Sequence, residues 1–141
     1  MISLPGMRSD AFIDAVHSLS KEKLEATLDP DIKFFSPVTF RSYDGRDLVT
    51  LIITEGPMKL FEDFEYVHTI ENPDEPTAAL IFRARVGDRW MDGLDLLSFG
   101  DDGLITEFKV MLRPKSAVDA MAAAMGRRFE ELGLTQPHAS A

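Results

Sequence analysis

Residues 78–113 read AALIFRARVGDRWMDGLDLLSFGDDGLITEFKVMLR and predict three antiparallel strands joined by two tight turns. Gly87-Asp88 fits a two-residue hairpin loop, and residues 100–103, GDDG, fit a four-residue loop. These loop lengths fix the register of the strands, and strand side chains alternate between the two faces of a sheet. One predicted face is almost wholly apolar apart from a single carboxylate; it consists of Leu80, Phe82, Ala84, Val86, Met91, Gly93, Asp95, Leu97, Phe99, Leu104, Thr106, Phe108, Val110 and Leu112.

Asp95 is the carboxylate on this apolar face, and the register places it opposite Phe108 and beside Leu80 and Leu97. A carboxylate in apolar surroundings loses hydration, so it finds donors, stays protonated or lines a cavity. Desolvation would raise its pKa and suit it to general acid or base catalysis near neutral pH. The alternative is a structural carboxylate satisfied by a buried donor. The candidate donors are a helix, Tyr43, Tyr66 and His68.

The length of 141 residues predicts a single domain with its own core. We expect the core to span about residues 8–132, with residues 1–7 and 134–141 loose. The start of the chain lacks the pattern of a signal peptide, and no apolar run is long enough for a membrane helix, so we expect a cytoplasmic protein.

The net charge of -9 argues against nucleic-acid binding, because a phosphate backbone would be repelled. The chain has no cysteine, and its three histidines form no metal-ligand spacing. No Gly-rich phosphate loop is present either. We therefore expect neither a metal nor an organic cofactor.

The other segments predict helices before and after the strands. Residues 9–28 favour two short helices, residues 31–36 a strand, and residues 45–61 a helix interrupted at Gly56-Pro57. Residues 64–70 alternate as in a strand, and a last helix should run from 116 to 132. This order indicates an α+β fold, a strongly curved and mostly antiparallel sheet with helices on one side.

Three segments resemble the SnoaL-like branch of the nuclear transport factor 2-like superfamily. They are residues 28–47 (LDPDIKFFSPVTFRSYDGRD), 61–70 (FEDFEYVHTI) and 93–114 (GLDLLSFGDDGLITEFKVMLRP). The resemblance covers about residues 8–130 and implies a cone-shaped α+β barrel that encloses a pocket for a small apolar molecule. Members include polyketide cyclases, limonene epoxide hydrolase, ketosteroid isomerase and proteins without catalysis, so the fold alone does not define the activity.

The resemblance carries over to individual residues only in part. Asp95 matches the first aspartate of the Asp-Arg-Asp relay of limonene epoxide hydrolase, but Gly93 stands at the arginine position and Val110 at the second aspartate. That relay is therefore incomplete. Polyketide cyclases use a single pocket aspartate as acid or base, which Asp95 could supply. The base aspartate, tyrosine and protonated aspartate of ketosteroid isomerase have no matching set here.

Other polar and aromatic residues are candidates for the same pocket. Tyr66 and His68 alternate on one strand and are predicted to share a face, so both could act beside Asp95, although a structural role is an equal alternative. Ser36 could donate a hydrogen bond into the pocket or simply end a strand, and Phe40 could line the pocket wall or belong to the core. The predicted ligand-binding walls comprise Phe34, Tyr43, Phe82, Leu97, Phe108 and Val110.

The opposite face of the three strands predicts a homodimer. The register places Arg83 across from Asp92 and Trp90 between Arg85 and Arg113, as a cation-π anchor. Apolar patches rimmed by arginine are common in interfaces. The alternative is that the last helix covers this patch within one chain. The predicted interface residues are Arg83, Arg85, Trp90, Leu94, Met111 and Arg113.

Three functions remain open from the sequence. The first is a cofactor-independent enzyme of isomerase, cyclase or hydrolase type, which needs Asp95 within hydrogen-bond reach of a second polar group around an open cavity. A non-catalytic ligand-binding protein would keep the cavity without needing that pair. A dimerisation module would fill the cavity with side chains.

Overall fold

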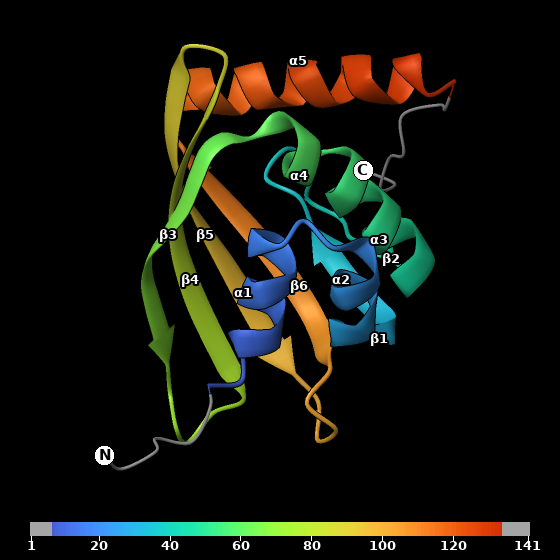
Figure 1. Ribbon diagram of the computed structural model, residues 1–141, viewed down its shortest axis with the longest axis vertical. Coiled ribbons are helices and arrows are strands. Elements are labelled where there is room, and N and C mark those ends of the chain that lie inside the picture. The colour runs from blue at the N-terminus through green and yellow to red at the C-terminus, as the bar shows by residue number, and fades with distance from the viewer. Residues whose placement is uncertain (1–6, 134–141) are drawn as a thin grey trace.

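The computed structural model describes residues 7–133, which form one six-stranded sheet and five helices (Figure 1). The predicted loose ends, apart from Met7, lie outside these residues. The helices are α1 (Asp10–His17), α2 (Lys21–Thr27), α3 (Arg46–Glu55), α4 (Pro57–Leu60) and α5 (Lys115–Glu131). The strands are β1 (Leu28–Phe35), β2 (Tyr43–Asp44), β3 (Glu62–Glu71), β4 (Thr77–Val86), β5 (Arg89–Phe99) and β6 (Ile105–Arg113).

The sheet has the strand order β2-β1-β6-β5-β4-β3 and is antiparallel except where β1 pairs with β6. It curves around α1, α2 and α3, and α5 lies across one end of the curve (Figure 1). The predicted α+β cone is therefore confirmed. A curved sheet with helices on its concave side can hold a pocket between the two layers.

The β4–β5 hairpin has the predicted register, with Leu80 opposite Asp95 and Phe82 opposite Gly93. Gly87 begins the turn with φ +60°, a left-handed conformation that glycine adopts without steric cost. Leu80 and Phe82 are buried on the concave face, and Asp95 is buried with them. The prediction that strand parity turns Asp95 inward is confirmed.

The β5–β6 register differs from the predicted one by two residues. Phe99 pairs with Ile105, so the loop is one residue longer than predicted, and a bulge between Ser98 and Phe99 adds a second residue. Asp95 therefore lies opposite Val110, not opposite Phe108. Bulges insert an extra residue and change which side chains face inward. Ile105 is consequently buried at the start of β6, whereas Leu104 and Thr106, predicted to face inward, are only partly buried. Beyond the bulge the parity of Phe108 and Val110 is as predicted.

The first two helices pack against the concave face of the sheet. Phe12 and Ala15 of α1 and Leu24 of α2 are buried in one core cluster with Leu28 of β1. The Ser20 side chain caps α2 by accepting a hydrogen bond from the Lys23 amide at 3.1 Å. No helix within residues 7–133 has the length and apolar character needed to cross a membrane.

The last helix packs on the concave side and leaves the outer face of the sheet uncovered. Ala117 and Met121 of α5 belong to a core cluster with Phe82, Ala84 and Met91, whose side chains face inward. Trp90 and Met111 on the outer face remain about half exposed, at 52% and 48%. The alternative in which the last helix covers this face is therefore wrong.

The predicted arrangement of charges on the outer face is correct only in part. Arg83 faces Asp92 and Arg85 faces Trp90 across β4 and β5, as predicted. Arg113 instead lies opposite Asp92 and donates to it at 2.9 Å, because the register of β6 is shifted by two residues. Arg85 donates to Asp63 and Glu62. The Arg-Trp-Arg stack is thus not among the ring contacts of the described residues.

Candidate active site

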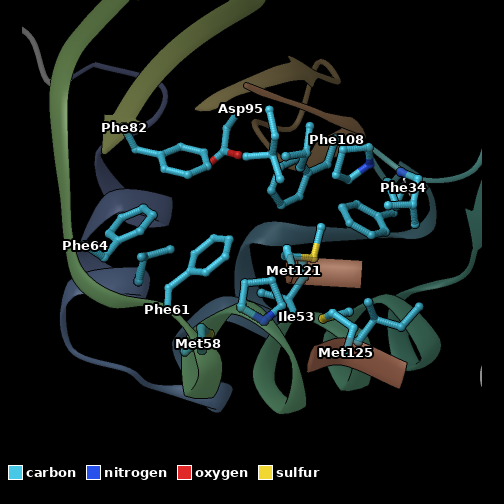
Figure 2. Close-up of a pocket in the computed structure, with 18 of the residues that line it drawn as sticks. Phe34, Ile53, Met58, Phe61, Phe64, Phe82, Asp95, Phe108, Met121 and Met125 are labelled. Carbon is cyan, nitrogen blue, oxygen red and sulfur yellow. Dashed lines mark hydrogen bonds between the residues drawn. The ribbon is translucent and has the colours of Figure 1, made fainter. Parts of the chain in front are cut away.

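A cavity of about 330 Å³ lies between the concave face of the sheet and the helices. This volume is at the lower end of the range for small-molecule sites. Figure 2 shows the Asp95 side chain reaching into the cavity, with Phe61, Phe64 and Phe82 on one side and Phe34 and Phe108 on the other. The polar side chains that line it are His17, Ser36, Tyr43, Tyr66 and Asp95, and the remaining lining residues are apolar.

The helices supply the wall opposite the sheet. Met121 and Met125 of α5 line the cavity with Ile53 of α3 and Met58 of α4 (Figure 2). Gly56, where α3 gives way to α4, lets Met125 approach, because a β-carbon there would overlap the Met125 side chain. Methionine side chains adapt to irregular shapes, so this wall can adjust to different ligands.

Asp95 and Tyr66 form a hydrogen-bonded pair inside the cavity. The Tyr66 hydroxyl donates to Asp95 Oδ2 at 2.8 Å, and Asp95 is only 5% exposed. Burial raises the pKa of Asp95 to about 7, and the hydrogen bond from Tyr66 opposes that rise. Burial and the neighbouring carboxylate raise the pKa of Tyr66 well above its ordinary value. Tyr66 therefore remains a donor, while Asp95 changes charge near neutral pH.

His68 does not share the face of Tyr66, contrary to the prediction. A bulge between these two residues pairs Tyr66 with Phe82 and His68 with Ile81, which turns His68 to the outer face, where it is exposed. His17, at the end of α1, lines the cavity instead, and its ring centroid lies 5.9 Å from that of Tyr66. The sequence indicates this placement in one way, because His17 lies four residues after Ile13 on the apolar stripe of the predicted helix.

Five of the six predicted wall residues line the cavity: Phe34, Tyr43, Phe82, Phe108 and Val110. Leu97 does not, because it is fully buried in the core. Ser36 lines the cavity, but its hydroxyl also binds Thr39 and accepts from two backbone amides of the following turn. Phe40 is 95% exposed and lies outside the cavity wall.

The lining residues that are exposed to solvent locate the opening of the cavity. His17, Leu19 and Val38 line it, and all three are exposed to solvent. Asp95 and Phe82 are almost fully buried at the sheet. A ligand entering past α1 and the loop after β1 would therefore meet the Tyr66–Asp95 pair at the inner end. Residues 7–133 contain no cluster of three or more metal-binding side chains.

Replacing Tyr66 with phenylalanine is expected to raise the pKa of Asp95 further. The lost hydrogen bond favours the ionised carboxylate, so the ionised fraction at pH 7 should fall. A carbon-13 NMR titration of the Asp95 carboxyl measures this shift directly. Tyr43→Phe, at the other tyrosine lining the cavity, is the matched control and should leave the titration of Asp95 unchanged. An unchanged titration in Tyr66→Phe would show that the pair is not formed in solution.

The fold and the cavity together define a cone-shaped α+β protein with an apolar pocket that contains a single carboxyl group among its described lining residues. A steroid delta-isomerase from Pseudomonas aeruginosa has a similar structure, with a TM-score of 0.84 and 34% identity, over 92% of this chain and 98% of that chain. A protein with a cystatin-like fold from Silicibacter pomeroyi DSS-3 gives a TM-score of 0.81 at 27% identity, over 87% of this chain and 85% of the other.

A nuclear transport factor 2-like protein from Cytophaga hutchinsonii shares the fold, with a TM-score of 0.64 at 15% identity, over 82% of this chain and 97% of that chain. No family model matches the sequence, and no curated protein matches it. The chain belongs to the SnoaL-like, nuclear transport factor 2-like superfamily, as its identity to the steroid delta-isomerase over nearly the whole of both chains shows.

Proposed function

We propose that the protein is a cofactor-independent isomerase that moves a proton within a small apolar ketone, with Asp95 as the acid and base. The observation that carries this proposal is the Tyr66–Asp95 hydrogen bond of 2.8 Å inside an apolar cavity. A carboxyl group with a pKa of about 7 exists in both protonation states near neutral pH, which suits it to accept and return one proton.

The proposed substrate is a β,γ-unsaturated ketone, and the reaction begins when ionised Asp95 removes a proton from the carbon between the carbonyl and the existing carbon–carbon double bond. The electron pair of the broken C–H bond forms a carbon–carbon double bond, and the carbonyl oxygen becomes an enolate oxygen. Protonated Asp95 then returns the proton to a different carbon of the conjugated enolate. The double bond has moved, and no atom or electron has been gained or lost. The apolar walls limit exchange of the proton with water.

Tyr66 has a positioning role in this scheme. Its hydroxyl fixes the orientation of the Asp95 carboxyl group and lowers its pKa relative to an unpaired buried aspartate. His17 also lines the cavity, with its ring centroid 5.9 Å from that of Tyr66, and is a candidate donor to a ligand oxygen near the pair.

The steroid delta-isomerase relative supports the choice of a double-bond isomerisation over hydrolysis. The test is turnover of β,γ-unsaturated ketones of different ring sizes, followed by the ultraviolet absorbance of the conjugated product. Conversion by the native protein that Asp95→Asn abolishes would support the proposal. Binding of these ketones without conversion of any of them would contradict it.

A non-catalytic ligand-binding protein is the second candidate, and one observation favours it. The Ser36 hydroxyl, which could otherwise stabilise an enolate oxygen, already bonds within its own turn. A binder would retain the cavity and would not depend on the charge of Asp95. The open cavity of about 330 Å³ argues against the third candidate, a dimerisation module filled by side chains.

We also propose that two copies of the chain pair through the outer face of the sheet. Trp90, Met111 and Ile70 are all about half exposed there, and no described helix covers them. The ion pairs of Asp92 with Arg83 and Arg113 form a row between Trp90 and Met111, so a two-fold arrangement would bury apolar residues on both sides of a row of paired charges.

Replacing Trp90 with glutamate is expected to convert the dimer to monomers. Two glutamates would face each other or the apolar centre across the two-fold axis, where desolvating a charge is unfavourable. Sedimentation velocity gives the mass of each species. The control is Phe40→Glu, at a residue that is 95% exposed and lies in the loop after β1, outside the strands that form this face. A native protein that sediments as a monomer would contradict the proposal.

A further inference from the structure

The ring of Phe82 rests directly on the backbone of Gly93 at the inner end of the cavity. The two residues are partners across β4 and β5. A β-carbon added at Gly93 would lie 2.6 Å from Cε1 of Phe82 and would overlap the end of the ring. Carbon atoms in contact are normally about 3.5–4.0 Å apart. Glycine at this position therefore allows the Phe82 ring to lie flat against the sheet.

Other aromatic rings restrict where Phe82 could move. The centroid of its ring is 4.9 Å from that of Phe64, 5.9 Å from that of Phe61 and 6.3 Å from that of Tyr66. Figure 2 shows the ring extending from β4 toward the Asp95 carboxyl group. A ring displaced from Gly93 would have to move into the cavity, where it would occupy space beside Asp95.

We propose that Gly93 and Phe82 set the size limit of the ligand at the Asp95 end of the cavity. The inference rests on the proposed function, because it assumes that the cavity binds a ligand. The ligand is a flat apolar molecule that stacks its inner end on the Phe82 ring and presents a polar or acidic group to Asp95. Removing part of the Phe82 ring lengthens the space for such a ligand, and a methyl group at Gly93 shortens it.

The experiment measures the affinities of phenol, 2-naphthol and 2-anthrol, which are flat and differ by one ring at a time. The ratio of the affinity for 2-anthrol to the affinity for phenol is compared between proteins. This ratio should be at least about tenfold higher in Phe82→Leu than in the native protein, since a change of pocket size by one methylene changes discrimination by about 10–200-fold. Gly93→Ala should weaken 2-naphthol by about tenfold relative to phenol. The double variant Gly93→Ala/Phe82→Leu should regain binding of 2-naphthol, because the smaller side chain relieves the overlap.

Gly100→Ala is the matched control, because it adds the same methyl group just after β5, where its closest neighbours are Asp102 and Thr106 at 3.3 Å. It should leave the order of affinities unchanged. If Gly93→Ala does not fold, Phe82→Leu and the double variant still decide the outcome. A size preference in Phe82→Leu equal to that of the native protein would overturn the proposal, as would native protein that binds none of the three probes.

The outcomes separate this inference from the proposed activity. Altered size preference without turnover of any ketone would support the size limit and contradict the isomerase. Turnover that depends on Asp95, together with an unaltered size preference, would support the isomerase and overturn the size limit.

Discussion

Asp95→Asn is expected to lower kcat for a β,γ-unsaturated ketone by about 10²–10⁴-fold, the usual contribution of a general acid or base. The asparagine side chain has nearly the same shape, and its carbonyl oxygen can still accept the Tyr66 hydrogen bond. It cannot take up a proton from carbon. The loss should therefore appear in kcat, while binding of an unreactive saturated ketone is retained.

Two features of this experiment identify a catalytic role. The activity of the native protein should rise with pH as Asp95 ionises, with a midpoint near its pKa of about 7. Asp101→Asn, an exposed aspartate in the β5–β6 turn, is the control and should keep native activity and the same pH profile. If Asp95→Asn keeps most of the activity, the proton acceptor is a different group and the proposed mechanism is wrong.

The sequence predicts the position of Asp95 because that position depends on short-range rules. The β4–β5 hairpin loop and the alternation of strand side chains are enough to turn Asp95 inward with Leu80 and Phe82. The apolar character of the facing residues then predicts its desolvation. The same reasoning gives the concave and outer faces of β4 and β5, because no bulge interrupts their pairing.

The errors come from local irregularities that single-sequence patterns do not reveal. The bulge between Tyr66 and His68 reverses the orientation of His68. The bulge at Ser98 and a β5–β6 loop one residue longer than predicted together shift β6 by two residues. Leu97 has the correct parity, but whether an inward side chain lines a cavity or fills the core depends on which helix lies over it. His17 reaches the cavity only because α1 packs against Tyr66, a contact between segments distant in sequence.

Asp95→Asn is also expected to stabilise the protein at alkaline pH, by as much as about 4 kcal/mol. The ordinary aspartate pKa of 3.8 applies to the unfolded chain, and burial raises the pKa of Asp95 to about 7 in the folded protein. Between these values the folded state holds a proton that the unfolded state has released. The native free energy of unfolding therefore falls as pH rises from about 4 to about 7 and then remains level with respect to this group. Asparagine carries no charge and avoids this loss.

Urea unfolding at pH 5 and at pH 8.5 measures the effect as a difference between the two proteins. The pKa of Glu55 is lowered by hydrogen bonds from Lys59 and Arg128. Glu55 contributes equally to the pH dependence of the unfolding free energy in the native protein and in Asp95→Asn, so its contribution cancels from the difference. The advantage of Asp95→Asn should be larger at pH 8.5 than at pH 5, whereas Asp101→Asn should show no such change. A pH-independent difference would mean that Asp95 is not desolvated. Asp95→Asn is therefore predicted to gain stability and lose activity for the same reason. Burial makes the ionised carboxylate unfavourable, and the same burial raises the pKa of Asp95 into the range needed for proton transfer.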